Sequence, residues 1–276
     1  DHFDYLDRWS ATASVTRMLG SGGRSFLRIE AGPAQDRAVE QNISRGLFVE
    51  GEGFRPNRGI HEGSYFSSGA VLELNPQVTG LFVNRGVGVR LRYDRADGGL
   101  QWQRLEARVA ARRPIGPLDL HARVDAGTLI GDAVPQVLFE IGQWEGLSAY
   151  RYKEFGGDRA ASGRALLGYT LPVLRAPIRL PNRLFIPGIA PGVAVGVQGG
   201  WAEASSEAAW RALRDLGTFT DTSTGMQMPI SRPTDGIRAS GEVLLTLFNG
   251  TLALGVARPL DRSGPWRFTG RIGQGF

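Results

Sequence analysis

The feature that most constrains the fold is an alternation of apolar and polar residues with a period of two, which recurs along most of the chain. Between residues 85 and 93, one face carries Val87, Val89, Leu91 and Tyr93, and the other carries Gly86, Gly88, Arg90 and Arg92. A period of two places alternate side chains on opposite faces of a β-strand. We expect about eleven strands from such runs, at residues 8–17, 24–32, 65–74, 85–93, 104–111, 118–126, 161–171, 188–202, 237–248, 251–258 and 266–276.

The alternation suits two architectures. No stretch approaches the roughly 18 consecutive apolar residues of a membrane-spanning helix, so a helical membrane protein is excluded. A strand of a transmembrane barrel needs only about 9 to 11 residues, of which every second one faces lipid. The mean hydropathy of −0.17 is compatible with such strands. A soluble β-sandwich gives the same alternation, so the period alone leaves both architectures open.

The connections between the expected strands favour the barrel. The long ones, 33–64, 129–158 and 203–235, all fall at the same end of the strands. Outer-membrane barrels have short periplasmic turns and longer external loops, whereas a Greek-key sandwich has no reason to keep this order. The sequence therefore predicts an all-β fold, a transmembrane antiparallel up-and-down β-barrel, as part or all of a barrel of about 12 to 16 strands.

One long connection also predicts a helix. Residues 205–217 read SSEAAWRALRDLG, with a serine cap, an acidic first turn and a glycine stop. We expect a short surface helix here, on which Trp210 and Leu213 are packing residues.

The parity of the strands bears on the start of the chain. If the chain end is periplasmic, an odd number of strands places Asp1 on the external side, although single-chain bacterial barrels have even strand numbers. We therefore expect residues 1–276 to be one outer-membrane barrel domain, the C-terminal part of a longer chain. The alternative is an uncounted strand near residues 1–8, 43–50 or 136–141.

A Gly-rich and aromatic segment carries a family resemblance. Residues 135–158 read PQVLFEIGQWEGLSAYRYKEFGGD and precede the strand that ends at Pro172. This segment resembles the bacterial surface-antigen barrel family of Gram-negative outer membranes, the BamA, TamA and two-partner-secretion transporter type. The resemblance implies a sixth external loop that folds into the barrel lumen. Its tip motif maps onto Leu147, Ser148, Ala149, Tyr150 and Arg151.

The tip departs from the family pattern at both members of an ion pair. Where the family has Arg and Gly, this chain has Ser148 and Ala149, and the partner Asp is replaced by Gln198. Gly200 matches the glycine of the family. Losing both partners of a buried pair is close to neutral, whereas losing one leaves an uncompensated charge. We expect Ser148 to hydrogen-bond Gln198, or Arg151 to supply the guanidinium; the alternative is an ordered loop in a barrel of another family.

The chain end carries the second part of the resemblance. Residues 266–276 read WRFTGRIGQGF, an alternating strand that stops on an aromatic residue. The last strand of the family has a terminal aromatic that the assembly machinery reads. By this resemblance, the barrel signal consists of Phe268, Ile272 and Phe276.

Charged residues occupy the inward face of the expected strands. We interpret them as a lumen ion network; its members are Arg90, Arg92, Arg104, Glu106, Arg108, Arg123, Asp125, Arg164 and Glu242. An anion-selective pore is the functional alternative. The net charge of +5 does not indicate nucleic-acid binding, because the arginines follow strand spacing and do not cluster.

The sequence gives no support for catalysis. The histidines, His2, His61 and His121, form no recognisable catalytic or metal-binding spacing, and no phosphate-binding GxxxxGK[ST] motif occurs. We expect no enzyme activity, no cofactor and no metal, and we interpret His121 as a wall residue of the lumen.

The resemblance implies a function in the bacterial outer membrane. It implies membrane-protein insertion or polypeptide export without nucleotide, with the lipid bilayer, a polypeptide substrate and periplasmic or outer-membrane subunits as partners. The alternative is a passive porin-like barrel, or a structural barrel within a larger outer-membrane complex.

Overall fold

A computed structural model describes residues 4–20, 24–40, 57–79, 85–143, 146–179, 185–186, 188–221 and 225–272. Most of these residues lie in one antiparallel sheet of 12 strands, in which β2 pairs with β3 and the order is β1-β3-β4-β5-β6-β7-β10-β13-β16-β17-β18. The strands are β1 Asp7–Ser10, β2 Ala13–Leu19, β3 Ser25–Arg37, β4 Gly63–Leu74, β5 Gly86–Gly98, β6 Trp102–Ile115, β7 Leu118–Gly131, β10 Arg159–Thr170, β13 Gly192–Glu203, β16 Arg238–Leu247, β17 Leu252–Pro259 and β18 Arg267–Ile272. The predicted antiparallel up-and-down architecture is confirmed.

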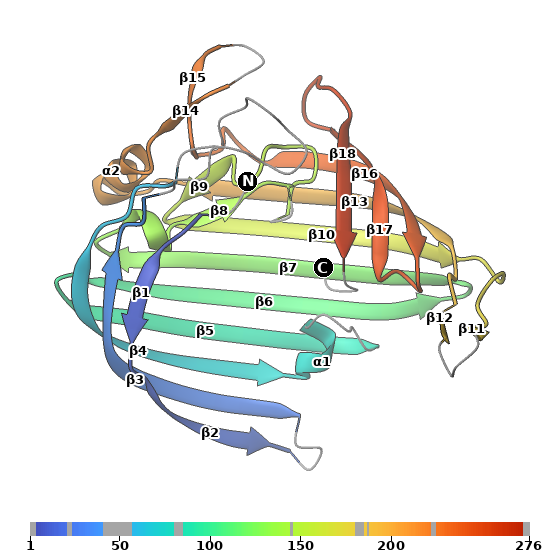
Figure 1. The fold of residues 1–276 in the computed structure, drawn as a ribbon, viewed down its shortest axis with the longest axis horizontal. Helices are drawn as coiled ribbons and strands as arrows, with labels where there is room; N and C mark the ends of the chain where they lie inside the picture. Colours follow the sequence, from blue (N-terminus) through green and yellow to red (C-terminus); the bar gives the residue numbers. More distant parts are fainter. Residues whose placement is uncertain are drawn as a thin grey trace.

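The sheet is strongly curved, and its two ends carry different elements (Figure 1). One end carries helix α2 (Glu207–Asp215) and the strand pair β14 (Thr218–Thr220) and β15 (Gln227–Pro229). The opposite end carries helix α1 (Pro76–Thr79) and the pair β11 (Ile178–Arg179) and β12 (Phe185–Ile186). Among the described strands β18 pairs with β17 alone, so they do not close the circle.

Strand β13 shows why the two faces of the sheet differ. Val193, Val195 and Val197 point outward and are 46, 55 and 57% exposed, whereas Ala194 and Gln198, at alternate positions, are buried. The same alternation continues to the last strand. There Phe268 and Ile272 lie on the outer face, 70 and 85% exposed, while Phe276 lies outside the described residues. An apolar outer face and a polar inner face are what a membrane barrel requires.

The first expected strand, 8–17, is divided into β1 and β2, and the predicted 33–64 loop is too long at both ends. Strand β3 continues through Pro33 to Arg37, and β4 begins at Gly63. The Ala11 amide donates to the Pro33 carbonyl at 3.1 Å. A Cβ on Gly32 would lie 1.8 Å from the Ala11 carbonyl oxygen. Glycine permits this close approach, and proline is tolerated where the strand pairing is interrupted.

The structure differs among the three segments in which an uncounted strand was expected. Near the start, Asp7 begins β1, which is part of a strand already expected. Residues 139–141 do form a strand, but outside the large sheet. Residues 43–50 lie outside the described residues.

Helix α2 forms where the sequence predicts it. The Ser206 side chain caps the helix by accepting from the Ala209 amide at 3.1 Å, so one of the otherwise unpaired first-turn N–H groups is satisfied. Leu213 is 4% exposed and packs as expected. Trp210 is 47% exposed, so its predicted packing role is wrong. Residue 210 follows Ala209 by about 100° around the helix axis, so it lies at the edge of the face that Ala209, Ala212 and Leu213 bury, where its large ring extends into solvent.

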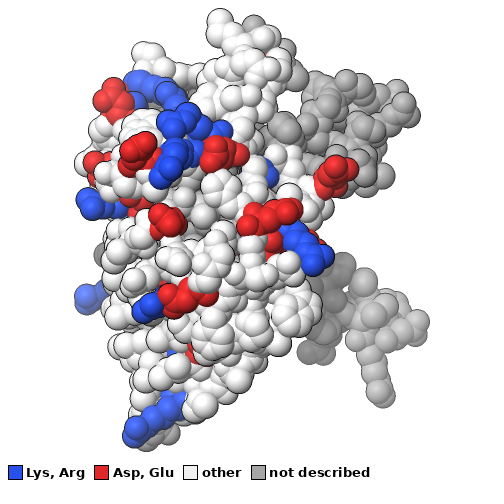
Figure 2. All heavy atoms as spheres, turned by 90° about the vertical axis from the view of Figure 1, so that its left-hand side faces the viewer, with Lys and Arg blue, Asp and Glu red and all other residues white. Residues whose placement is uncertain are grey.

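The end of the barrel that carries α2 has a mixed surface charge. Figure 2 views the molecule from this side and shows acidic and basic side chains lying among one another. A surface of mixed charges is well hydrated and does not produce a strong electrostatic field of one sign. No helix in the described residues is long and apolar enough to span a membrane.

A substitution on the outer face of β13 tests whether this face contacts lipid. If Val197 contacts lipid, Val197→Arg lowers the free energy of unfolding by about 2–4 kcal/mol, because a charge on the lipid face near the midplane is costly. Ile237→Arg is the matched control, since Ile237 is 73% exposed in the connection before β16. Urea titration in lipid vesicles measures both variants. Equal effects of the two substitutions would contradict a lipid-facing β13.

Candidate functional site

The connection between β7 and β10, residues 132–158, folds into the lumen and is called the lumen loop below. It contains the short helix η1 (Pro135–Val137) and the paired strands β8 (Phe139–Ile141) and β9 (Phe155–Gly157). These strands pack against the inner faces of β10 and β13. The sequence predicts an ordered loop here and offers residues 136–141 as one alternative place for a strand, where β8 lies. It does not predict the pairing with β9, because three-residue strands are too short to show a period.

The end of the lumen loop is fixed to the start of α2. A Cβ on Gly157 would lie 1.9 Å from the Glu203 carbonyl oxygen, so only glycine allows this contact between loop and wall. The next residue, Asp158, accepts hydrogen bonds from the Ser205 amide and hydroxyl, both at 2.7 Å, and from the Ser206 hydroxyl at 3.2 Å. Asp158 therefore ties the loop to the residue that caps the helix.

The predicted tip residues are deeply buried in the lumen. Leu147, Ser148, Ala149 and Tyr150 are 0, 2, 2 and 1% exposed. Leu147 packs directly over Gly200, where an added Cβ would lie 3.2 Å from its Cδ1 and 2.9 Å from Ile141 Cδ1. The small residue on β13 leaves the space that the tip fills.

Four side chains, Ser148, Gln198, Glu242 and Arg271, form a cluster that we call the tip clamp. The Ser148 amide donates to Gln198 Oε1 at 2.6 Å, and Gln198 Nε2 donates to Ser148 Oγ at 2.8 Å. Ser148 Oγ donates to Glu242 Oε2 at 2.8 Å. Arg271 donates to Ser148 Oγ at 2.9 Å and to Glu242 Oε2 at 2.5 Å. The clamp thus joins the loop to β13, β16 and β18.

The guanidinium of the clamp comes from the last strand. Arg151, the residue expected to supply it, instead lies 4.9 Å from the centre of the Phe219 ring and 3.7 Å from Glu154. Arg271 was not among the lumen charges predicted from the sequence. The alternation along the last strand could have indicated Arg271, because Phe268 and Ile272 face outward and residue 271 therefore faces the lumen.

Tyr150 connects the tip to the turn between β17 and β18. Its hydroxyl donates to Asp261 Oδ1 at 2.5 Å, and the Arg262 guanidinium lies 4.8 Å from the centre of its ring. Burial alone would raise the pKa of Asp261, but hydrogen bonds from Tyr150, the Ala239 amide and Arg238 outweigh it and lower this pKa to about 2. Asp261 is therefore ionised at neutral pH, which strengthens its bond to Tyr150.

A second ion network holds the loop at the mouth of the lumen. Arg58 donates to Glu140 at 2.5 Å, and Lys153 lies 3.3 Å from the same carboxylate. Lys153 also donates to Asp4 at 2.7 Å. The Arg58, Glu140 and Asp4 side chains are each less than 10% exposed. Such buried charges are stable only when paired, so the network fixes the relative positions of the segments that carry them.

The predicted lumen charges form ion pairs on the inner face of the sheet, and two of the arginines share Asp125. The closest contacts are Arg90 with Glu73 at 3.4 Å, Arg92 with Asp94 at 2.6 Å, Arg104 with Glu106 at 2.9 Å, Arg108 with Asp125 at 2.6 Å, Arg123 with Asp125 at 2.5 Å and Arg271 with Glu242 at 2.5 Å. Arg164 lines a cavity beside Arg123. Glu242 belongs to the tip clamp and does not line this cavity.

The tip clamp is suited to holding a loop in place. The Ser148 hydroxyl takes part in three hydrogen bonds, one donated and two accepted, which uses its full capacity. No histidine is among its hydrogen-bond partners, so the arrangement lacks the base of a serine nucleophile. No group of acidic or histidine side chains in the described part of the chain is placed to hold a metal ion.

Comparison with known proteins identifies the fold. No protein-family model and no curated protein sequence matches the chain. The crystal structure of BamA from Haemophilus ducreyi lacking POTRA domains 1–3 is similar, with a TM-score of 0.61, 13% identity, and coverage of 96% of this chain and 54% of that chain. CdiB from Acinetobacter baumannii is also similar, with a TM-score of 0.54, 12% identity, and coverage of 96% and 41%. The chain has the barrel fold of these proteins and spans about half of their length.

The tip clamp predicts a pattern of stabilities. Arg271→Gln leaves the Glu242 side chain, which is 2% exposed, without its cation, so we expect the free energy of unfolding to fall by about 3–5 kcal/mol. The double variant Arg271→Gln/Glu242→Gln should recover most of this loss, because neither partner then carries a charge.

Arg95→Gln is the control, because Arg95 and Asp97 form an exposed pair on the outer face of β5, with side chains 47 and 51% exposed. Urea titration of the protein in vesicles should show no change for this variant. A double variant as unstable as Arg271→Gln would show that the clamp does not depend on charge pairing.

Proposed function

We propose that the chain forms a bacterial outer-membrane barrel that assists the insertion or export of polypeptides without using a nucleotide. The observation that carries this proposal is the lumen loop, whose buried tip is bonded to β13, β16 and β18. Through Arg271 and Asp261, the loop contacts the last strand and the turn before it. Because the loop is bonded to the last strand, a movement of the loop in the lumen would also act on the edge of the sheet.

The packing of the tip argues against a passive pore. A porin keeps a water-filled channel through its barrel. Here the side chains of Leu147 and Tyr150 are 0 and 1% exposed within the lumen, and Leu147 lies against the barrel wall at Gly200. The loop therefore occupies space that a passive channel needs.

The structural likeness supports the same class. BamA and CdiB share the barrel fold over 96% of this chain. By analogy we propose the lipid bilayer, a polypeptide substrate and other outer-membrane or periplasmic subunits as partners. Because the sequence has no GxxxxGK[ST] motif, we attribute the driving force to folding of the substrate in the membrane.

The second candidate is a passive or structural barrel. The inward arginines favour it, because rings of cationic side chains select anions in pores. In that case the loop is a permanent plug and the barrel has no effect on other polypeptides.

The neighbouring glycines of β13 offer a matched pair of variants. Gly200→Val places methyl groups where Leu147 and Ile141 lie, so we expect the tip to leave its position and ion conductance through the barrel to rise. Gly199→Val is the control, because a Cβ there meets nothing closer than 3.9 Å. Planar-bilayer recordings measure conductance, and refolding of an unfolded eight-stranded barrel protein into vesicles measures insertion.

Under the proposed function, the wild type and Gly199→Val speed the refolding of the substrate over protein-free vesicles and conduct weakly. Gly200→Val conducts more and loses the acceleration. A wild type with a large, steady, anion-selective conductance and no effect on the substrate would overturn the proposal in favour of the passive barrel.

A further inference from the structure

Four arginines of adjacent strands line one cavity on the inner face of the sheet, together with Asp125. Arg90 on β5 is directly opposite Arg108 on β6, and Arg123 on β7 is directly opposite Arg164 on β10. Like charges directly opposite each other on adjacent strands are destabilising. The pairing of Arg108 with Asp125 brings both like-charged pairs to the same place.

The cavity is lined by five arginines and three acidic residues. Glu106 in the lining pairs with Arg104, and Glu73 outside it pairs with Arg90. Asp125 is shared, since Arg108 lies 2.6 Å and Arg123 2.5 Å from it. Glu140 faces the same region, but it is already paired with Arg58 and Lys153. The local balance is therefore positive.

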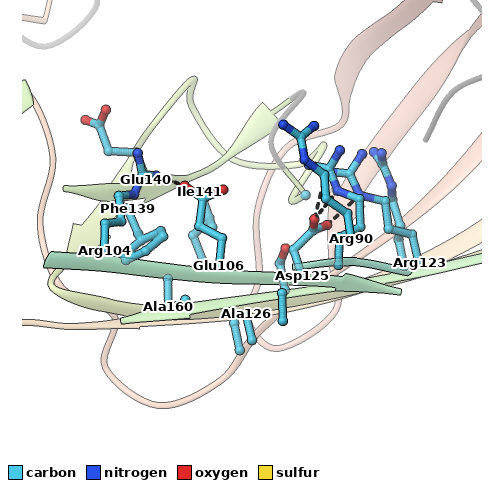
Figure 3. Close-up of a pocket in the computed structure, with 17 residues that line it drawn as sticks. Arg90, Arg104, Glu106, Arg123, Asp125, Ala126, Phe139, Glu140, Ile141 and Ala160 are labelled. Carbon is cyan, nitrogen blue, oxygen red and sulfur yellow. Dashed lines mark hydrogen bonds and ion pairs between the residues drawn. The ribbon is translucent and has the colours of Figure 1, made fainter. Parts of the chain in front are cut away.

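These side chains line a cavity of about 200 Å³ between the wall of the barrel and the lumen loop. Its other walls are formed by Phe139, Ile141, Gly146 and Ser162. Figure 3 shows Arg90 and Arg123 beside Asp125 at one side of the cavity, with Arg104 and Phe139 at the other. A liquid water occupies about 30 Å³, so the space suits several waters or one small anion with waters.

Solvent reaches the guanidinium groups of the cavity. The side chains of Arg90, Arg108 and Arg123 are 35, 30 and 14% exposed. Arg104 also lines the cavity, and its buried Nε has no hydrogen-bond partner in the described residues. The site thus offers N–H donors from several strands to a group that enters it.

We propose that this cavity binds a tetrahedral oxyanion of the phosphate or sulfate class, either as a free ion or as a phosphorylated headgroup. Each guanidinium presents a planar set of donors that matches the oxygens of such an anion. A tetrahedral dianion has enough oxygens to contact arginines of β5, β6, β7 and β10 together. It also offsets the repulsion within the two like-charged pairs. This site adjoins the tip clamp, because Arg164 is directly opposite Gln198 on the neighbouring strand, but no clamp side chain lines the cavity. The proposal does not depend on the proposed transport function.

The first test measures the affinity for inorganic phosphate by calorimetry, in detergent and at constant ionic strength. We expect Arg123→Gln/Arg164→Gln to weaken binding at least about tenfold, because charge-assisted hydrogen bonds are lost. Arg28→Gln is the control, since Arg28 is an inward arginine paired with Glu30 at 3.2 Å and does not line the cavity. Heat-dependent gel mobility checks that each variant is folded, and Arg164→Gln alone replaces the double variant if that one does not fold.

Removing the acidic residue of the cavity should change the affinity for phosphate in the opposite direction. Asp125→Asn removes the carboxylate that competes with the ligand, so phosphate should bind more tightly than in the wild type. A general effect of salt would change all variants in the same direction. The proposal is overturned if the wild type does not bind phosphate, if Arg28→Gln weakens binding as much as the cavity variants, or if Asp125→Asn binds more weakly.

The source of the anion is distinguished with lipid. Nanodiscs that contain phosphatidic acid present the same chemistry on a headgroup. If this lipid lowers the apparent affinity for inorganic phosphate in the wild type but not in the arginine variants, the site takes headgroups; if it has no effect while phosphate binds, the site takes the free ion.

Discussion

A backbone N–H or C=O group in hydrocarbon has no water to bond, so a strand in a membrane must satisfy its groups on neighbouring strands. This constraint fixes the long antiparallel ladder from β3 to β17. It also leaves side chains free to differ between faces, which is why Val195 and Val197 point outward while Gln198 points inward. Everything placed in the lumen depends on that division.

The lumen loop shows how polar chemistry is used once it is shielded from lipid. A buried carboxylate such as Glu242 is tolerable only with a cation and hydrogen bonds around it. Arg271 and Ser148 provide these from the last strand and from the loop tip. The contact that satisfies one charge therefore also fixes the position of the loop. By contrast, Arg108 and Arg123 share Asp125, and the cavity beside it is lined by more arginines than carboxylates. That difference separates a structural cluster from a candidate binding site.

The sequence predicted the strands and the Ser148 to Gln198 contact, because a period of two determines which face a residue occupies. It did not reveal Arg271 as the cation. The pattern gives the face of a residue but not which loop reaches it across the lumen. For the same reason Arg151, adjacent to the tip in sequence, was the wrong choice. The break between β1 and β2 had a local signal in Gly32 and Pro33, but its position depends on the pairing with Ala11.

The loop tip lies on β13 inside the barrel, and disulfide crosslinking tests this position most directly. The chain has no cysteine of its own that could form a competing disulfide. A Cβ at Gly200 lies 3.4 Å from Leu147 Cγ, so Leu147→Cys/Gly200→Cys should form a disulfide on mild oxidation of the folded protein. The control pair Leu147→Cys/Gly199→Cys should not, because residue 199 points outward. Failure of the first pair to crosslink, or equal crosslinking of both, would contradict the docked loop.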